Sequence, residues 1–184
     1  MGLVVLCACV LTLGCSGGPQ QQSAGAVKPD GVESALAQGN AYADRGMVAQ
    51  SEASYRSAIS ARPSDSRAYV NLAQLYIRTG HLDEAEQVLS SAVRVNPKDI
   101  RAHNELGNIC YARKSYSLAR KHYQDALAVE PDCYEAHWNL VATCFALNRQ
   151  EEALEHCRRY VDLAPRTERA NIQRAQFYLD GQRP

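Results

Sequence analysis

Apolar and small residues recur at fixed offsets within successive units of the stretch 32–167, and their spacing is helical. The second unit shows the pattern most clearly, with Leu72, Ala73 and Tyr76 followed by Ala85, Leu89 and Ala92. Separations of three and four residues place such side chains on one face of a helix. Polar residues fill most of the other positions. Each unit is therefore predicted to contain two amphipathic helices.

A proline closes each unit and sets its length. Pro63, Pro97, Pro131 and Pro165 follow one another at intervals of 34 residues. Proline stops a helix, because it lacks an amide hydrogen and its ring clashes with the preceding turn. An unbroken 34-residue period is the signature of a helix–turn–helix solenoid. The predicted repeats are 32–65, 66–99, 100–133 and 134–167.

A capping helix is expected over 168–180, because a terminal repeat leaves an apolar face that must be covered. Thr167 is the predicted N-cap of this helix. Gly181 follows its expected end. Small residues at the eighth and twentieth positions of each repeat are expected to let the paired helices approach closely.

The pattern resembles the tetratricopeptide repeat family over all four units. The second unit, YVNLAQLYIRTGHLDEAEQVLSSAVRVNP, is the most similar, whereas Gln38, Ser51 and Tyr160 depart from the family pattern. The resemblance implies an all-α fold over 32–184, a right-handed superhelical solenoid. It also implies a concave groove, lined by the first helix of each repeat, that binds a protein or peptide.

Family offsets that face the groove give a set of candidate binding residues. These are Val70, Gln74, Ile77, Asn104, Asn108, Tyr111, Trp138 and Phe145. Trp and Tyr are common interface anchors, and amide side chains can both donate to and accept from a partner's backbone. The alternative is that Trp138 and Phe145 pack under the capping helix or between neighbouring helices.

Some members of the family clamp a peptide's terminal carboxylate with Lys and Asn. Here Asn40 and Asn71 match the asparagines, but Leu36 stands where the first Lys would be. We therefore do not expect this clamp.

The N-terminal segment resembles a bacterial lipoprotein signal over 1–14. The apolar run 3–13 is too short to span a bilayer, which needs about 20 residues, and it fits an export signal. Leu13-Gly14-Cys15 resembles the cleavage site, with Cys15 lipidated, for example by palmitate. Thr12 and the lack of Lys or Arg before the run depart from the pattern. The alternative is a plain cleaved secretory signal.

Two neighbouring features bear on location. Ser16, which is not Asp, favours the outer membrane facing the periplasm, by resemblance to sorting in Gram-negative bacteria. The segment 15–31 is rich in Gly, Ser and Gln and is expected to be a flexible tether.

Composition and cysteine spacing exclude several function classes. The formal net charge is zero, which gives no electrostatic argument for nucleic acid. Cys144 and Cys157 occupy offsets that meet between paired helices, so either a disulfide or two buried thiols fits them. No CxxC pair, nucleophile–base pair or phosphate loop is present, and His81, His103 and His122 are interpreted as packing or surface residues. No metal, cofactor or enzymatic activity is predicted.

The anchor and the repeats together indicate a membrane-tethered scaffold that binds a protein or peptide. This combination is similar to lipoproteins that help to assemble type IV pili or secretins. The second hypothesis is a non-catalytic accessory subunit of an envelope enzyme complex, in peptidoglycan or polysaccharide synthesis.

Overall fold

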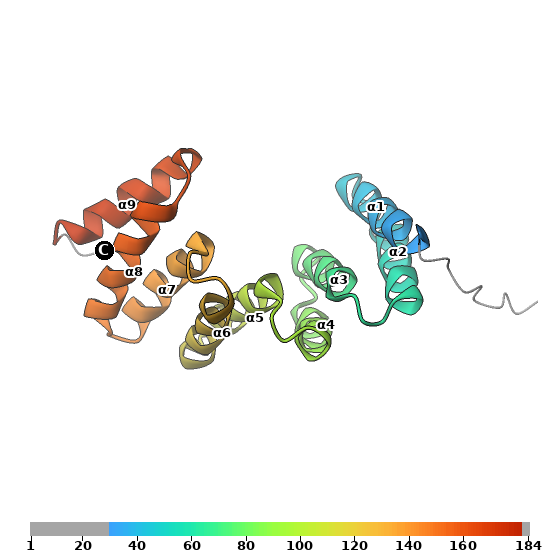
Figure 1. The fold of residues 1–184 in the computed structure, drawn as a ribbon, viewed down its shortest axis with the longest axis horizontal. Coiled ribbons are helices and arrows are strands. Elements are labelled where there is room, and N and C mark those ends of the chain that lie inside the picture. Colours follow the sequence, from blue (N-terminus) through green and yellow to red (C-terminus); the bar gives the residue numbers. More distant parts are fainter. Residues whose placement is uncertain (1–29, 182–184) are drawn as a thin grey trace, which may run out of the picture.

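The computed structural model describes residues 30–181, which form helices and turns without a strand. The helix pairs are α1 (Asp30–Asp44) with α2 (Val48–Ala61), α3 (Ser66–Arg78) with α4 (Leu82–Val95), α5 (Ile100–Ala112) with α6 (Tyr116–Val129), and α7 (Tyr134–Ala146) with α8 (Gln150–Leu163). A 3-10 turn, η1 (Arg166–Glu168), leads into α9 (Arg169–Leu179). Figure 1 shows the pairs along an arc, with α4 and α6 on its convex side. The all-α solenoid with a capping helix is confirmed.

The signal, most of the tether and Cys15 lie outside the described residues. Among those described, no helix is both long enough and apolar enough to cross a bilayer.

The turn inside each repeat reverses the chain through one residue in the left-handed region. Gly46, Gly80, Lys114 and Asn148 have φ values of 71, 81, 61 and 58°. They lie 34 residues apart, so the turn is the same in every repeat. Glycine adopts this conformation at little cost, whereas Lys does so against a steric penalty.

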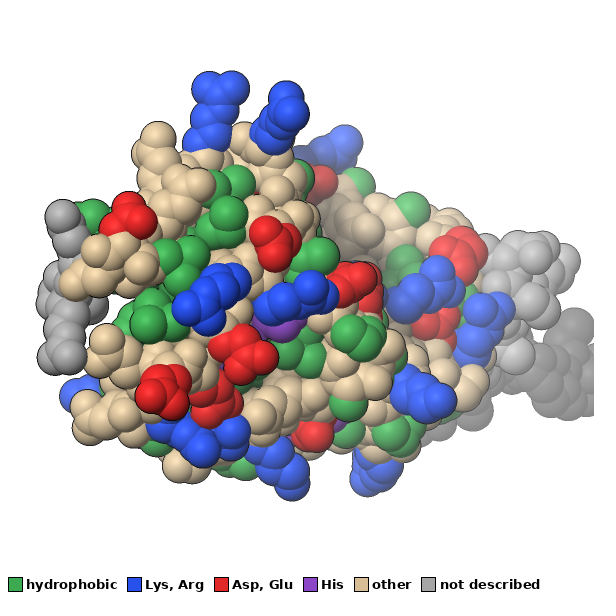
Figure 2. Space-filling view, turned by 60° about the vertical axis from the view of Figure 1, so that its left-hand side comes forward, with side chains coloured by type: hydrophobic (Ala, Val, Ile, Leu, Met, Phe, Trp, Pro, Cys, Tyr) green, Lys and Arg blue, Asp and Glu red, His purple; other side chains and the backbone are tan. Residues whose placement is uncertain are grey.

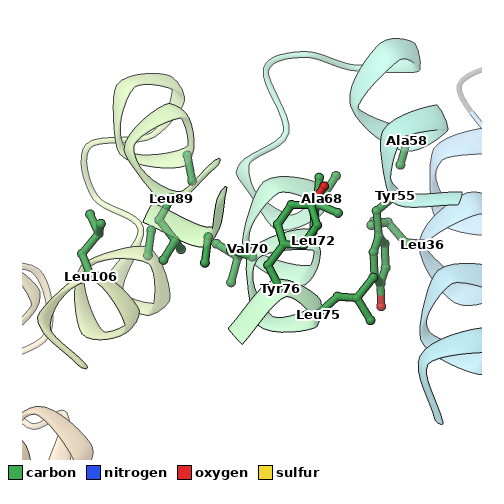
Figure 3. Close-up of a cluster of buried hydrophobic side chains, with 14 of the residues drawn as sticks. Leu36, Tyr55, Ala58, Ala68, Val70, Leu72, Leu75, Tyr76, Leu89 and Leu106 are labelled. Carbon is green, nitrogen blue, oxygen red and sulfur yellow. The ribbon is translucent and has the colours of Figure 1, made fainter. Parts of the chain in front are cut away.

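One cluster of buried hydrophobic side chains runs from the first repeat through the second and into the third. Figure 3 shows it from Leu36 of α1, past Tyr55 and Leu72, to Leu106 of α5. The twentieth position of each repeat is completely buried, in Ser51, Ala85, Ala119 and Ala153. Because each pair buries its apolar face against its neighbours, the repeats depend on one another for stability.

The capping helix packs on α8 through Ala175, which is fully buried beside Cys157 and Tyr160. The prediction that Thr167 caps it is wrong. Thr167 is exposed within η1, and α9 begins at Arg169 without a side-chain cap. The reason is that the chain tightens after Pro165, whose carbonyl accepts from the Glu168 amide at 2.9 Å.

Candidate functional site

Four of the cavities in the described part of the chain open along the first helices of the repeats. The largest of these four, of about 680 Å³, is called here the central cavity, and most of its lining residues are polar: Gln74, Ile100, Arg101, Asn104, Glu105, Asn108, Glu130, Asp132, Cys133, Tyr134, Glu135, Trp138, Asn139, Tyr160, Glu168 and Asn171. Cavities of about 370 and 240 Å³ continue it toward α1, around Asn40 and Asn71. The aromatic cavity, of about 410 Å³, lies toward α9.

The amide side chains of the central cavity form a connected row centred on Glu105. Gln74 donates to Glu105 Oε1 at 3.1 Å, and Asn108 donates to Glu105 Oε2 at 3.3 Å. The Tyr123 hydroxyl donates to Asn108 Oδ1 at 2.8 Å from the core side. Asn104 donates to Cys133 Sγ at 3.6 Å, while its Oδ1 is buried without a partner among the described residues. Asn104 therefore offers an unused acceptor.

Charge in the central cavity is predominantly negative. Arg101 is its one basic side chain, against the carboxylates of Glu105, Glu130, Asp132, Glu135 and Glu168. Asp132 is neutralised by Arg159 at 2.6 Å. The remaining acids accept hydrogen bonds from neutral groups or face solvent, so the cavity favours a positively charged ligand group.

Trp138 lines both the central and the aromatic cavities. Its ring centroid lies 4.8 Å from that of Tyr160 on α8. Burial raises the pKa of Tyr160 to about 12, and this phenol donates to Glu168 Oε2 at 3.3 Å. Tyr160 of α8 thus holds the Trp138 ring in place, while part of the ring surface stays accessible from the two cavities.

The aromatic cavity is apolar except for one cation. Phe145 packs edge-on against Tyr178 of α9, with ring centroids 5.1 Å apart. Tyr111, 37% exposed, lies across the cavity, and Arg174 is its one charged lining residue. Phe145 thus packs against the capping helix and Trp138 against the neighbouring helix α8, while both side chains also line a cavity.

Two of the predicted groove residues on α3 differ in their surroundings. Ile77 is half-buried and lines the 370 Å³ cavity. Val70 is completely buried, on the side of α3 that faces the next repeat (Figure 3). The prediction that Val70 reaches the groove is therefore wrong, because inter-repeat packing encloses it.

Glu105 and Asn139 were missed from the sequence, whereas Asn71 was named only as a match to a clamp asparagine. Asn71, Glu105 and Asn139 all line cavities and stand at the sixth position of successive repeats. Polar residues that recur at one offset beside an apolar position were the signal that could have found them.

Of the two alternatives for Cys144 and Cys157, a disulfide or buried thiols, the structure shows free thiols. Cys144 packs with Cys110 and Leu140, whereas Cys157 packs with Val141 in a separate apolar cluster. Burial raises the pKa of each thiol to about 11. Both therefore act as small apolar side chains.

Acidic and basic side chains are interspersed on the face shown in Figure 2, with hydrophobic side chains between them. No single-sign patch dominates this face, in agreement with the balanced net charge.

Two tetratricopeptide repeat models match residues 42–109 and 115–166. The chain belongs to the tetratricopeptide repeat family. No curated protein sequence matches it.

Solved structures with the same fold include a crystal structure of MamA protein, with 18% identity, a TM-score of 0.68, and coverage of 85% of this chain and 86% of that one. Pseudomonas aeruginosa pilF shares 18% identity, with a TM-score of 0.65 over 84% of this chain and 78% of that one. The first such domain of Spaghetti (RPAP3), bound to the HSP90 peptide SRMEEVD, shares 25%, with a TM-score of 0.62 over 67% and 98%.

Proposed function

We propose that this protein is a scaffold that binds an extended segment of a partner protein along its central and aromatic cavities. The observation that carries the proposal is the continuity of the two cavities through Trp138. Amides on one side suit a peptide backbone, and exposed aromatic surface on the other suits apolar side chains. The role is binding, without a chemical step.

The peptide-bound relative supports this mode, but the chemistry of the ligand differs here. The SRMEEVD peptide is acidic. In this chain Leu36 is buried at the position where a carboxylate-clamping Lys would stand, and the central cavity carries several acids. The proposed ligand is therefore a segment with a basic group for the central cavity and apolar side chains for the aromatic cavity.

We further propose that a lipid on Cys15 holds the complex at the bacterial outer membrane, facing the periplasm. Several acyl chains on one residue exceed the marginal binding that a single chain provides. The scaffold would then assist assembly of an envelope complex such as a type IV pilus. An accessory role in a peptidoglycan- or polysaccharide-synthesising complex is the second candidate. In a Cys15→Ser variant, the protein should leave the membrane fraction; retention there would contradict the anchor.

Affinity capture from detergent-solubilised membranes tests the binding surface. Tyr111→Ala removes an exposed ring from the aromatic cavity, and Phe177→Ala removes a similarly exposed ring (44%) that lines none of the cavities described. Capture should fall at least about tenfold for Tyr111→Ala, as for an interface anchor, and stay unchanged for Phe177→Ala. Equal capture by both variants would contradict the assignment. The identity of the captured protein separates the pilus from the synthetic complex.

A further inference from the structure

The third and fourth repeats carry the same pair of histidines between their helices. His103 of α5 faces His122 of α6 with ring centroids 5.8 Å apart, and His137 of α7 faces His156 of α8 at 5.1 Å. The first histidine of each pair bonds through Nε2 to a proline carbonyl, at 3.1 Å for His103 and 3.0 Å for His137. A carbonyl oxygen only accepts, so Nε2 carries the proton and Nδ1 presents a lone pair.

The two pairs differ in whether the Nδ1 lone pair of the first histidine has a hydrogen-bond partner. His137 Nδ1 lies 2.9 Å from His156 Nδ1, so the fourth repeat closes the pair with its own hydrogen bond. In the third repeat, Nδ1 of His103 and Nδ1 of His122 are both buried without a partner among the described residues. His103 is only 6% exposed, so bulk water does not serve its lone pair. A buried acceptor without a partner requires an explanation.

A third residue beside the histidines also differs between the third and fourth repeats. Asp125 stands one turn beyond His122 on α6, and its Oδ2 lies 3.9 Å from His103 Nδ1. The equivalent residue in the fourth repeat is Arg159, which pairs with Asp132 at 2.6 Å. One repeat thus places a carboxylate beside its histidines, and the other places a cation there.

We propose that His103, His122 and Asp125 form a binding site for a divalent transition-metal ion, with zinc as the expected ligand. One donor atom from each residue lies within 4.8 Å of the other two. Two imidazole nitrogens and a carboxylate oxygen are a common zinc donor set, with solvent as the fourth ligand. None of the three residues lines the cavities described above, so this site is separate from the peptide-binding surface.

The surroundings of the site suit a metal. Metal-binding histidines usually donate their other ring N–H to a backbone carbonyl, as His103 does to Pro97. Burial lowers the pKa of His122, which keeps its ring neutral as a ligand must be. Donor atoms around tetrahedral zinc lie roughly 3.3 Å apart. The donor atoms of the three residues must therefore move slightly closer together when the ion binds. Asp125, with 43% of its side chain exposed, is free to move inward.

A second group, Cys144, Glu152 and His156, also brings its donor atoms within 4.8 Å. The side chains of this second group already have hydrogen-bond or ion-pair partners, or are protonated. Glu152 is bonded by Arg120 at 2.8 Å and by Arg149 at 3.0 Å, and His156 is bonded to His137. Burial raises the pKa of the Cys144 thiol to about 11, so it remains protonated at neutral pH. A metal there would have to displace two cations and a proton.

Calorimetric titration of the purified full chain with Zn²⁺ tests the proposal, with circular dichroism to verify folding of each variant. The chain should bind one equivalent. Asp125→Arg, which installs the side chain of the fourth repeat, and His122→Gln should each weaken binding at least about tenfold. His156→Gln, which removes a ligand of the rival group, should leave affinity unchanged.

Titration with Co²⁺ identifies the donor atoms independently. Bound Co²⁺ should show visible absorption without a sulfur-to-metal charge-transfer band. The proposal is overturned if the unaltered chain does not bind Zn²⁺, if Asp125→Arg binds as tightly, if His156→Gln weakens binding, or if thiolate charge transfer appears.

Discussion

A Cβ atom on Gly107 would lie 2.4 Å from Cε1 of Tyr123, so α5 accepts only glycine opposite this ring. The hydroxyl of the same tyrosine donates to Asn108 Oδ1 in the central cavity. Core packing therefore orients a side chain of the binding surface. The first repeat uses the same arrangement, with Gly39, Tyr55 and Asn40.

Gly107→Ala should lower the free energy of unfolding by about 1–3 kcal/mol, because the added methyl group overpacks the ring. Urea unfolding measures the loss. The matched control is Gly107→Ala combined with Tyr123→Leu, which reproduces the Ala73 and Leu89 of the second repeat. The double variant should be more stable than the sum of the two single changes predicts. Simple additivity would show that the ring and the glycine are not coupled.

Lys114 is expected to destabilise the protein, because its backbone is held in the left-handed region. It holds φ of 61° at a position where the first two repeats have glycine. Lys114→Gly should stabilise the protein by up to about 1 kcal/mol, since relief of the left-handed penalty exceeds the entropy that glycine loses on folding. Asn148→Gly should gain less, because Asn tolerates this conformation better. A thermal melt in which Lys114→Gly loses stability would contradict this.

Stability should fall on mild acidification. Burial lowers the pKa of His122, His137 and His156 in the folded state, whereas the unfolded chain titrates near about 6.5. The unfolded state therefore binds more protons, so stability is full above that value and is lost as pH falls through the folded pKa values.

Melting temperatures measured in a metal chelator between about pH 7 and pH 5 test this expectation. The loss should be smaller in a His122→Gln, His156→Gln variant. A flat profile for the unaltered protein, or an equal slope in the variant, would count against it.

The thiols of Cys144 and Cys157 should resist alkylation in the native state, since both are completely buried. Peptide mapping after maleimide treatment should find them unmodified, and modified once urea is added. A peptide pair linked through these two residues before reduction would contradict the free-thiol assignment.

The sequence was sufficient to predict the solenoid, because a repeat encodes its helix pair by local spacing and its stop by proline. The offsets taken from the family resemblance placed Trp138 and Phe145 among the groove candidates, and both line the aromatic cavity. They failed at Val70 because burial there depends on the neighbouring repeat and not on the offset alone. The partnerless Nδ1 acceptor of His103 depends on which of its ring nitrogens the carbonyl of Pro97 engages. The spacing of residues along the sequence does not determine these hydrogen-bond partners.

Photo-crosslinking in cells that make the full chain tests directly whether a partner protein binds along the first helices of the repeats. A photoreactive residue at Ala142, exposed in the aromatic cavity, is compared with one at Gln124, exposed on α6 outside the cavities described. We expect a discrete protein adduct from position 142 and little or none from position 124. An adduct from 124 alone, or equal adducts from both, would contradict a partner bound along the first helices.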